Sequence, residues 1–250
     1  MILHIALKEL KSLFLSPLAW TILAILQAIL AWIFFLQIDT FLTIQPQLAA
    51  LPNAPGVTDL VIAPLMANAS VLLLMISPLL TMRLLSEEQR SGSLHLLLSS
   101  PVSMLQITLG KYLGILFFLF ILLAQISLMP LSLYLGTSLD VGKFLAGLLS
   151  SALLLAAFAA AGLYFSSLTK NPLVAAMSTF GLLLMLWIID AAAGNNAARS
   201  EIFSYMSLLS HQLSMLRGTV DSRDVIYYLL FILTFLTLTI RHLDARRMQK

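Results

Sequence analysis

The chain has 250 residues, of which 60% are hydrophobic and only 10% are charged, and its mean hydropathy is +0.99. Soluble domains have about 25% charged residues, so this composition excludes an ordinary soluble protein and predicts a membrane protein. Because one transmembrane helix needs about 20 apolar residues, the length allows roughly five to seven spans and no large soluble domain. The absence of cysteine excludes disulfides, thiolate metal sites and a cysteine nucleophile.

Six continuous apolar runs, each bounded by charged, Pro or Gly residues, predict six transmembrane helices. The runs are 18–37, 60–82, 107–135, 144–168, 173–190 and 225–240. We therefore expect an all-α membrane protein with a single domain, 1–250. The connection 38–59 contains three prolines and is expected to be irregular.

The basic residues predict the orientation of these spans, because cytoplasmic segments are enriched in Lys and Arg. If the N-terminus is cytoplasmic, ten of the 14 basic residues lie inside and four lie outside. The four outside residues are Lys143, Arg199, Arg217 and Arg223. We therefore expect both termini to be cytoplasmic.

Residues 1–16 predict an amphipathic helix that lies on the membrane surface before the first span. Its apolar side recurs at helical spacing and comprises Leu3, Leu7, Leu10 and Phe14. Lys8 and Lys11 lie on the other side, and Ser16 should leave the helical region because Pro17 follows it. The alternative interpretation is that the first span begins early and these charges form its flank.

Residues 83–106, after the second run, concentrate charge in a chain that has very little. A charged stretch is followed by a glycine that permits a sharp turn and then by an apolar face. In chain order these residues are Glu87, Glu88, Arg90, Gly92, Leu94, Leu97 and Leu98. The pattern fits a short helix parallel to the membrane that docks on a cytoplasmic partner, and it fits a helical extension with a solvated face equally well.

The longest connection on the predicted outer side, 191–224, also has a helical pattern. Its apolar residues are Ile202, Phe203, Met206, Leu209, Leu213 and Leu216. The pattern ends at Gly218, a residue type that commonly ends helices. We expect a helix that lies in the outer interface or dips between neighbouring spans.

Small residues predict close packing between helices. They form a run at 156–162 in the fourth span, and Gly110 and Gly114 lie near the start of the third.

Several function classes are disfavoured. A phosphate-binding Gly-x-x-x-x-Gly-Lys-Ser/Thr loop is absent, since Gly110-Lys111 and Gly142-Lys143 are followed by Tyr and Phe. The four histidines have no carboxylate at ligand spacing, so no metal site is expected. An intramembrane peptidase built on Glu87 and Glu88 is disfavoured because no predicted span contains a histidine, and few acidic groups within the spans disfavour an ion-coupled pump. We expect no enzymatic activity.

Residues 86–103 resemble the Glu-Glu-x-Arg-x-Gly-Ser/Thr-Leu, Leu-Leu, Ser-Pro-Val-Ser signature of ABC type-2 transporter permeases. The segments 8–18 and 210–221 are similar to the gliding-motility branch of these permeases. The resemblance implies a permease subunit in a bacterial plasma membrane. It also implies that 83–106 forms the coupling helix, with an interfacial helix at 1–16 and external helices at 191–224.

The same resemblance implies the partners. These are two copies of a cytoplasmic ABC ATPase, which binds ATP and Mg, and a second permease subunit in a homodimer or heterodimer. An accessory membrane-anchored subunit is compatible with it, whereas no nucleic acid and no cofactor on this chain are expected. The implied activity is substrate export, and an apolar interior fits lipid-like cargo without identifying it. The alternative function is a membrane scaffold or tether that recruits a cytoplasmic partner.

Overall fold

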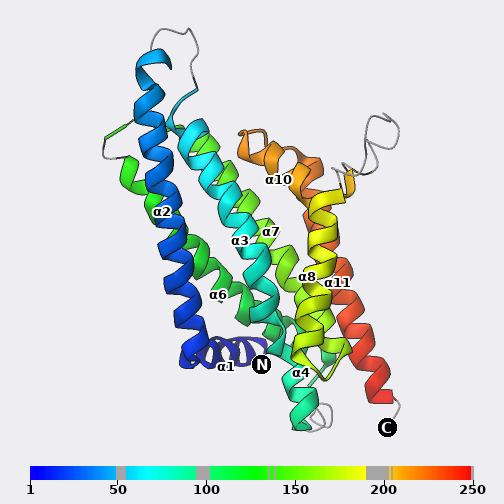
Figure 1. The fold of residues 1–250 in the computed structure, drawn as a ribbon. Helices are drawn as coiled ribbons and strands as arrows, with labels where there is room; N and C mark the ends of the chain where they lie inside the picture. Colours follow the sequence, from blue (N-terminus) through cyan, green and yellow to red (C-terminus); the bar gives the residue numbers. More distant parts are fainter. Residues whose placement is uncertain are drawn as a thin grey trace.

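The computed structural model describes residues 1–48, 55–93, 102–134, 136–137, 139–189, 203 and 205–248. These residues form helices and no strand, as the sequence predicts. The helices that follow the long axis of the bundle are α2 (Pro17–Leu48), α3 (Ala63–Thr81), α6 (Met104–Leu133), α7 (Val141–Leu168), α8 (Pro172–Ile188) and α11 (Ser222–Met248) (Figure 1). The shorter elements are α1 (Ile2–Leu15), the π-helix η1 (Thr58–Ile62), α4 (Arg83–Ser91) and α10 (Leu208–Leu216).

Five helical segments within the described residues are long and apolar enough to cross a membrane. They are Pro17–Gln47, Thr58–Ser91, Met104–Leu133, Val141–Leu168 and Ser222–Met248. The remaining predicted span, 173–190, corresponds to α8, which is apolar but has only 17 residues. Five of the six predicted spans therefore have a helix of spanning length, and the predicted span 173–190 stays a prediction.

Helix α2 extends well beyond the first apolar run. Residues 38–48 are helical, so the irregular connection expected to start at residue 38 is wrong for this part. The hydroxyls of Thr40 and Thr43 donate to carbonyl oxygens four residues earlier and so fit within the helix. Pro46 lies in the last turn of α2, so the one helical hydrogen bond that its missing N–H removes is near the end of the helix.

Helix α1 is separate from α2 and crosses the end of the bundle where both termini lie (Figure 1). The helix ends where the sequence predicts, because Ser16 has the extended conformation (φ −81°, ψ 128°) favoured before Pro17. We refer to this end of the molecule as the α1 end and to the opposite end as the α10 end.

Two glycines allow α1 to lie directly on α6. A Cβ atom at Gly110 would lie 2.7 Å from Cβ of Ile5, and one at Gly114 would lie 2.7 Å from Cβ of Glu9. Real Cβ atoms cannot approach so closely, so the predicted packing role of these glycines is confirmed.

The predicted apolar side of α1 is only partly used by this packing. Leu10 and Phe14 are half-buried against the core, whereas Leu3 and Leu7 are exposed on the surface of the chain. Helix α1 therefore has one side that packs on α6 and another apolar side that is left for the surroundings.

Helix α7 is the centre of the bundle and contacts α3, α6, α8, α10 and α11. The predicted run of small residues allows these helices to pack closely on α7, and Ala157, Ala159, Ala160 and Ala161 are completely buried. At Gly162 a Cβ atom would overlap the side chain of Thr81, so α3 and α7 cross in direct contact.

Helix α10 lies across the opposite end of the bundle from α1 (Figure 1). It ends near Gly218, whose positive φ of 90° matches the predicted stop. Of the predicted apolar stripe, Leu216 is buried whereas Met206 and Leu213 are exposed, and the polar His211 and Gln212 are buried as well. Their burial is possible because both side chains find hydrogen-bond partners. Ile202 lies outside the described residues.

Candidate functional site

The first component of the site is a break between α3 and α4 at the α1 end. Pro78 has no N–H and begins the last turn of α3, which stops at Thr81 before α4 resumes at Arg83. The break is bridged by Ser166 of α7. Its Oγ accepts from the N–H groups of residues 85 and 86 at 2.9 and 3.0 Å and donates to the carbonyl oxygen of Met82 at 2.8 Å. Helix α7 thus fixes the direction in which α4 leaves the bundle.

The second component is a buried ion-pair cluster around Lys111 of α6. The Lys111 side chain is only 2% exposed, and its Nζ lies 2.6 Å from Oε1 of Glu9 and 2.7 Å from Oε1 of Glu88. The three residues come from α6, α1 and α4. A buried ammonium is stable only when it is paired, so these contacts bind the three helices together. We call Glu9, Glu88 and Lys111 the inner triad.

The third component is Gln89, which joins α4 to α7 and α11. Its Nε2 donates to the carbonyl oxygen of Ser167 at 2.6 Å, where the last carbonyls of α7 lack partners within the helix. Its Oε1 accepts from Nη1 of Arg246 at 2.6 Å. Helix α4 is therefore connected through side chains to α1, α6, α7 and α11.

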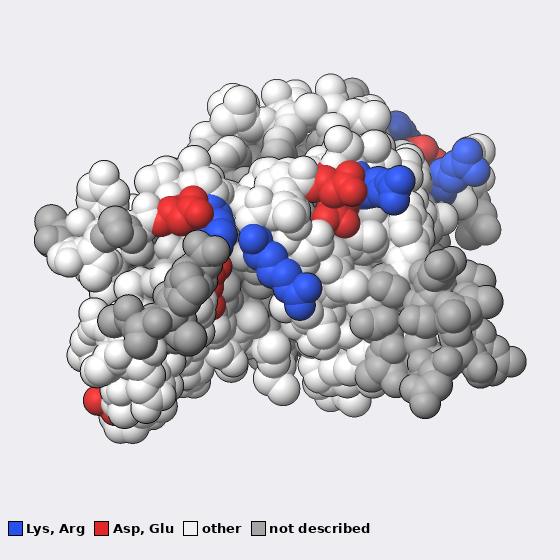
Figure 2. Space-filling model, turned by 90° about the horizontal axis from the view of Figure 1, so that it is seen from above, with Lys and Arg blue, Asp and Glu red and all other residues white. Residues whose placement is uncertain are grey.

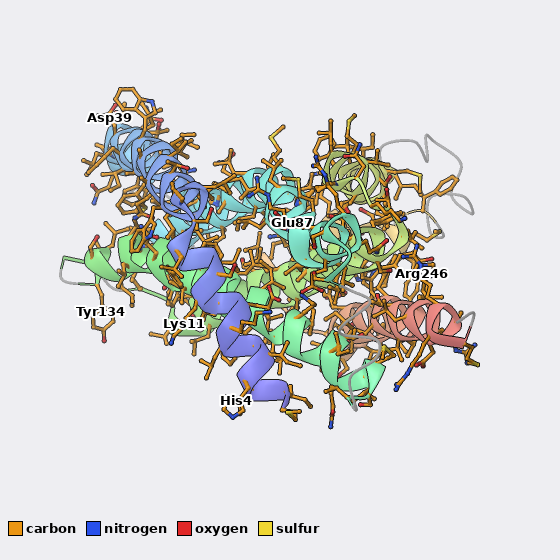
Figure 3. The ribbon with its side chains drawn as sticks, turned by 90° about the horizontal axis from the view of Figure 1, so that it is seen from below. His4, Lys11, Asp39, Glu87, Tyr134 and Arg246 are labelled. Atoms are coloured by element: carbon orange, nitrogen blue, oxygen red, sulfur yellow. The ribbon has the colours of Figure 1, made fainter. Side chains whose placement is uncertain are left out.

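The opposite side of α4 is open. Glu87 and Arg90, which the sequence singled out for docking, are both exposed, and Arg83 is exposed one turn before them. Figure 3 shows Glu87 on this end of the molecule, together with Lys11 of α1 and Arg246 of α11. The exposed charges lie where a partner approaching this end would meet them.

Two hollows flank α4. The one towards α1 has a volume of about 520 Å³ and is lined by residues of α1, α2, α3, α4 and α6, including the inner triad. The other, of about 620 Å³, lies between α4 and the start of α8 and is lined by Asn171 and Pro172 among others. Arg83 and Glu87 line both hollows. We call the first of them the α1 cavity.

The remaining predicted docking residues are only partly described. Gly92 follows α4 with a φ of 77°, a left-handed conformation that favours glycine, which agrees with the expected turn. Leu94, Leu97, Leu98 and Pro101 lie outside the described residues. The end of the predicted segment is a capping box in which Ser103 and Gln106 bond reciprocally, so α6 begins at Met104.

Glu88 differs from its neighbours in the predicted docking set. Its Oε1 pairs with Lys111, and its Oε2 is buried without a hydrogen-bond partner among the described residues. It therefore faces the bundle, whereas Glu87 and Arg90 face outwards.

An exposed apolar track leads from the α1 cavity along α3. Leu79 lines the cavity, and Met75 and Val71 follow it on the same side of the helix at intervals of four residues. All three side chains are exposed on the surface of the chain.

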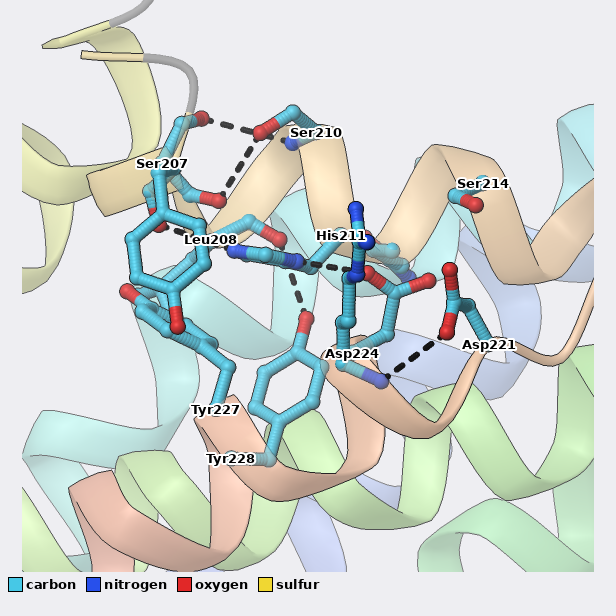
Figure 4. Close-up of polar contacts among 12 residues, drawn as sticks. Ser207, Leu208, Ser210, His211, Ser214, Asp221, Asp224, Tyr227 and Tyr228 are labelled. Atoms are coloured by element: carbon cyan, nitrogen blue, oxygen red, sulfur yellow. Dashed lines mark hydrogen bonds and ion pairs between the residues drawn. The ribbon is translucent and has the colours of Figure 1, made fainter. Parts of the chain in front are cut away.

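The α10 end is organised around His211, which is stacked on Tyr227 with ring centroids 4.1 Å apart. Its Nδ1 lies 2.6 Å from Oδ1 of Asp224, and its Nε2 lies 2.8 Å from the carbonyl oxygen of Tyr205 (Figure 4). Because a carbonyl can only accept, Nε2 must carry a proton and cannot act as a base towards a serine. The arrangement therefore fixes α10 on α11 and is not a hydrolase triad.

Further polar contacts close this end. Gln212 donates to Ser70 of α3, and the hydroxyl of Tyr228 donates to the carbonyl oxygen of Leu208 at 2.9 Å. On the rim, Lys143 pairs with Asp59 at 2.7 Å. Figure 2 shows this end as a mostly uncharged surface with small clusters in which basic and acidic side chains adjoin.

No group of three His, Cys, Asp or Glu residues suited to a metal ion occurs in the part of the chain that the structure describes.

Sequence reasoning did not identify Lys111, Glu9, Gln89, Ser166 or Arg246 as site residues. One signal was available for Lys111. It lies in the first turns of an apolar helix, where a charge is costly unless it is paired, and the chain has few acidic residues that could pair with it. Nothing in the sequence pattern indicates the roles of Gln89 and Ser166, because their partners are about 80 residues away.

The chain matches a protein-family model. The model of the family described as "ABC-2 family transporter protein" matches residues 3–242. No curated protein matches the chain.

Proposed function

The chain belongs to the ABC-2 family of transporter proteins, and from this premise we propose that it is a permease subunit whose α1 end receives a cytoplasmic ABC ATPase and transmits ATP hydrolysis to the membrane helices. The family match covers nearly the whole chain, which supports a transport component of the membrane. The chain would bind no cofactor itself, and ATP and Mg would be held by the ATPase.

The observation that carries this proposal is the double-sided character of α4. One side is joined to α1 and α6 through the inner triad and to α7 and α11 through Gln89. The other side exposes Arg83, Glu87 and Arg90. A partner that pushes on the exposed side would move a helix that is connected to most of the bundle.

The roles of individual docking residues follow from this division. Glu87 and Arg90 would pair with charges on the ATPase, and Gly92 would turn the chain towards Leu94 and Leu97, which would provide apolar anchors. Exposed charges mainly set orientation and association rate, whereas buried apolar residues contribute most of the affinity. Glu88 would act within the chain by holding Lys111.

The placement in the membrane is part of the proposal. The α1 end would be cytoplasmic in a bacterial plasma membrane, which the excess of basic residues on this side supports. Helix α1 would lie in the interface, with Leu3 and Leu7 in the lipid and Leu10 and Phe14 against the bundle. Helix α8 would serve as the fifth span in chain order, which gives six spans in all, with α10 and its flanking residues on the outer side.

The stoichiometry and direction rest on the resemblance of the sequence to ABC type-2 permeases. We expect a pair of permease subunits with two ATPase subunits and outward movement of the substrate. The narrower relationship to the gliding-motility branch rests on segments 8–18 and 210–221 alone, and the family match does not distinguish branches.

The proposal is tested with the Gly92→Pro variant in the complete complex reconstituted in liposomes. Proline fixes φ near −65° and cannot adopt the φ of 77° found here, so the turn should be distorted while Glu87 and Arg90 remain available. We expect ATP hydrolysis to continue while movement of the substrate is lost. Gly56→Pro is the matched control, because Gly56 lies near the α10 end and a Cβ atom there would have nothing within 4 Å.

Two outcomes would contradict the proposal. If Gly92→Pro assembles with the ATPase and changes neither hydrolysis nor movement, the segment is a tether and the scaffold function is favoured. If Gly56→Pro uncouples the complex as strongly as Gly92→Pro, the effect does not come from the α1 end.

A further inference from the structure

The α1 cavity contains a balanced set of charges. Its basic and acidic residues are Lys8, Arg83, Lys111, Glu9, Glu87 and Glu88. The inner triad contributes one positive and two negative charges and is therefore negative overall. Lys8, Arg83 and Glu87 have no ion-pair partner within the described residues and add one positive charge overall. A ligand that matches this cavity carries both signs and no net charge.

The two kinds of charge differ in what they can bind. Lys8 and Arg83 present only hydrogen-bond donors, which suit an anionic group such as a phosphate. The carboxylates present only acceptors, and Glu9 and Glu88 share a single ammonium, which leaves Oε2 of Glu88 without a partner. A primary ammonium supplies three donors for such oxygens, whereas a quaternary ammonium supplies none.

The cavity can also accommodate the apolar part of a ligand. Its lining includes Leu18 and Leu80, and Leu79 connects it to the exposed track through Met75 to Val71. Eight residues of α-helix span about 12 Å, and half of a bilayer core is about 15 Å thick. The track is therefore as long as most of one leaflet, and it starts at the level of α1.

We propose that the α1 cavity binds the headgroup of a zwitterionic lipid with a primary ammonium, of the phosphatidylethanolamine type, and that an acyl chain of this lipid lies along Leu79, Met75 and Val71. The phosphate lies towards Lys8 and Arg83, and the ammonium lies towards Glu87 and the inner triad. The proposal rests on the placement of α1 in the membrane interface that the proposed function includes, and it goes beyond that function because it concerns lipid binding and does not depend on an ATPase or on transport.

The test measures lipid binding to the purified full-length chain by native mass spectrometry, with three phospholipids that have identical acyl chains. The probes are phosphatidylethanolamine, phosphatidylcholine and phosphatidylglycerol. We expect one phosphatidylethanolamine to bind about tenfold more tightly than either of the others, because phosphatidylcholine lacks the N–H donors and phosphatidylglycerol lacks the ammonium.

Charge-removing variants locate the site. Lys8→Gln and Glu87→Gln should each weaken phosphatidylethanolamine binding by about tenfold. Lys170→Gln and Asp39→Asn are matched controls, because both residues are exposed and neither lines the cavity. Circular dichroism checks that all four variants keep the helical content of the unmodified chain, which is expected because the altered side chains are exposed.

Three results would overturn the proposal. The first is equal affinity for the three phospholipids. The second is unchanged phosphatidylethanolamine binding in both cavity variants. The third is binding of glycerophosphoethanolamine, which has no acyl chains, as tight as that of the lipid, because the site would then recognise a soluble zwitterion. None of these results bears on ATPase coupling, so the two proposals can fail separately.

Discussion

At each end of the bundle a short transverse helix is fixed onto long apolar helices. The two ends use different chemistry to do so. At the α1 end, α1 and α4 are joined to α6 by charged groups that meet at Lys111. At the α10 end, α10 is joined to α11 and α3 by a buried His211–Asp224 pair, a stacked tyrosine and amide and hydroxyl contacts. The α1 end also has open hollows, and α4 has exposed charges without an ion-pair partner among the described residues.

The difference indicates separate tasks for the two ends. At the α10 end, His211, Gln212 and Tyr228 bond to other groups of the chain and hold α10 across the bundle, while Oε1 of Gln212 and Oδ2 of Asp224 are buried without a partner among the described residues. At the α1 end the paired side of α4 leaves its other side free for a partner. Variants at the two ends should therefore have different consequences even where their effects on stability are similar.

The largest effect is expected at the inner triad. Lys111→Met should destabilise the chain by about 3–5 kcal/mol, because it leaves two partly buried carboxylates without their common cation. Thermal unfolding of the purified chain in detergent measures this effect. The triple variant with Lys111→Met, Glu9→Gln and Glu88→Gln is the control and should recover most of the stability, and an equal loss in both would contradict the assignment.

The next effect concerns the crossing of α3 and α7, which supports both ends. Gly162→Val should lower the stability of the folded chain by at least about 1–3 kcal/mol, because the new side chain would overlap Thr81 in a closely packed interior. Gly181→Ala tests the general effect of removing a glycine, since nothing lies within 4 Å of its Cβ position. The same unfolding measurement should leave Gly181→Ala close to the unmodified chain, and a comparable loss there would refute the explanation.

The sequence predicts most of the helices and few of the side-chain contacts that hold them together. Apolar runs locate the long helices, Ser16-Pro17 marks the end of α1, and Gly92 marks a turn, because each of these features depends on local conformational preference. The contacts between helices depend on pairs such as Lys111 with Glu9, which are 102 residues apart and have no periodic pattern. For the same reason the apolar stripe of α10 gives no indication that His211 and Gln212 are buried, since their partners lie on other elements.

A third prediction separates the two ends by function. His211→Phe should preserve the stacking on Tyr227 but leave Asp224 buried without its partner, at a cost of about 1–3 kcal/mol. We expect the purified variant to unfold at a lower temperature and still to retain the ATPase during purification. Loss of the ATPase from a chain that remains folded would show that the ends are not independent.

A smaller effect is expected at Gln89. Gln89→Leu removes the contacts to Ser167 and Arg246. It should lower the stability of the folded chain by about 1 kcal/mol, because both remaining partners lie at helix ends where water can replace the lost hydrogen bond. The informative quantity is the ratio of ATP hydrolysed to substrate moved in liposomes, which we expect to rise. An unchanged ratio would remove Gln89 from the connection between α4 and the bundle.

The measurement that tests the central claim most directly is the accessibility of single cysteines, which the absence of native cysteine makes straightforward. Arg90→Cys lies on the exposed side of α4, and Asp39→Cys lies on α2 near the α10 end. Each is labelled with a membrane-impermeant thiol reagent in open membranes, with and without the ATPase subunit. We predict that the ATPase protects residue 90 and leaves residue 39 reactive. Equal labelling of residue 90 in both conditions, or protection of residue 39 instead, would contradict docking of the ATPase at the α1 end.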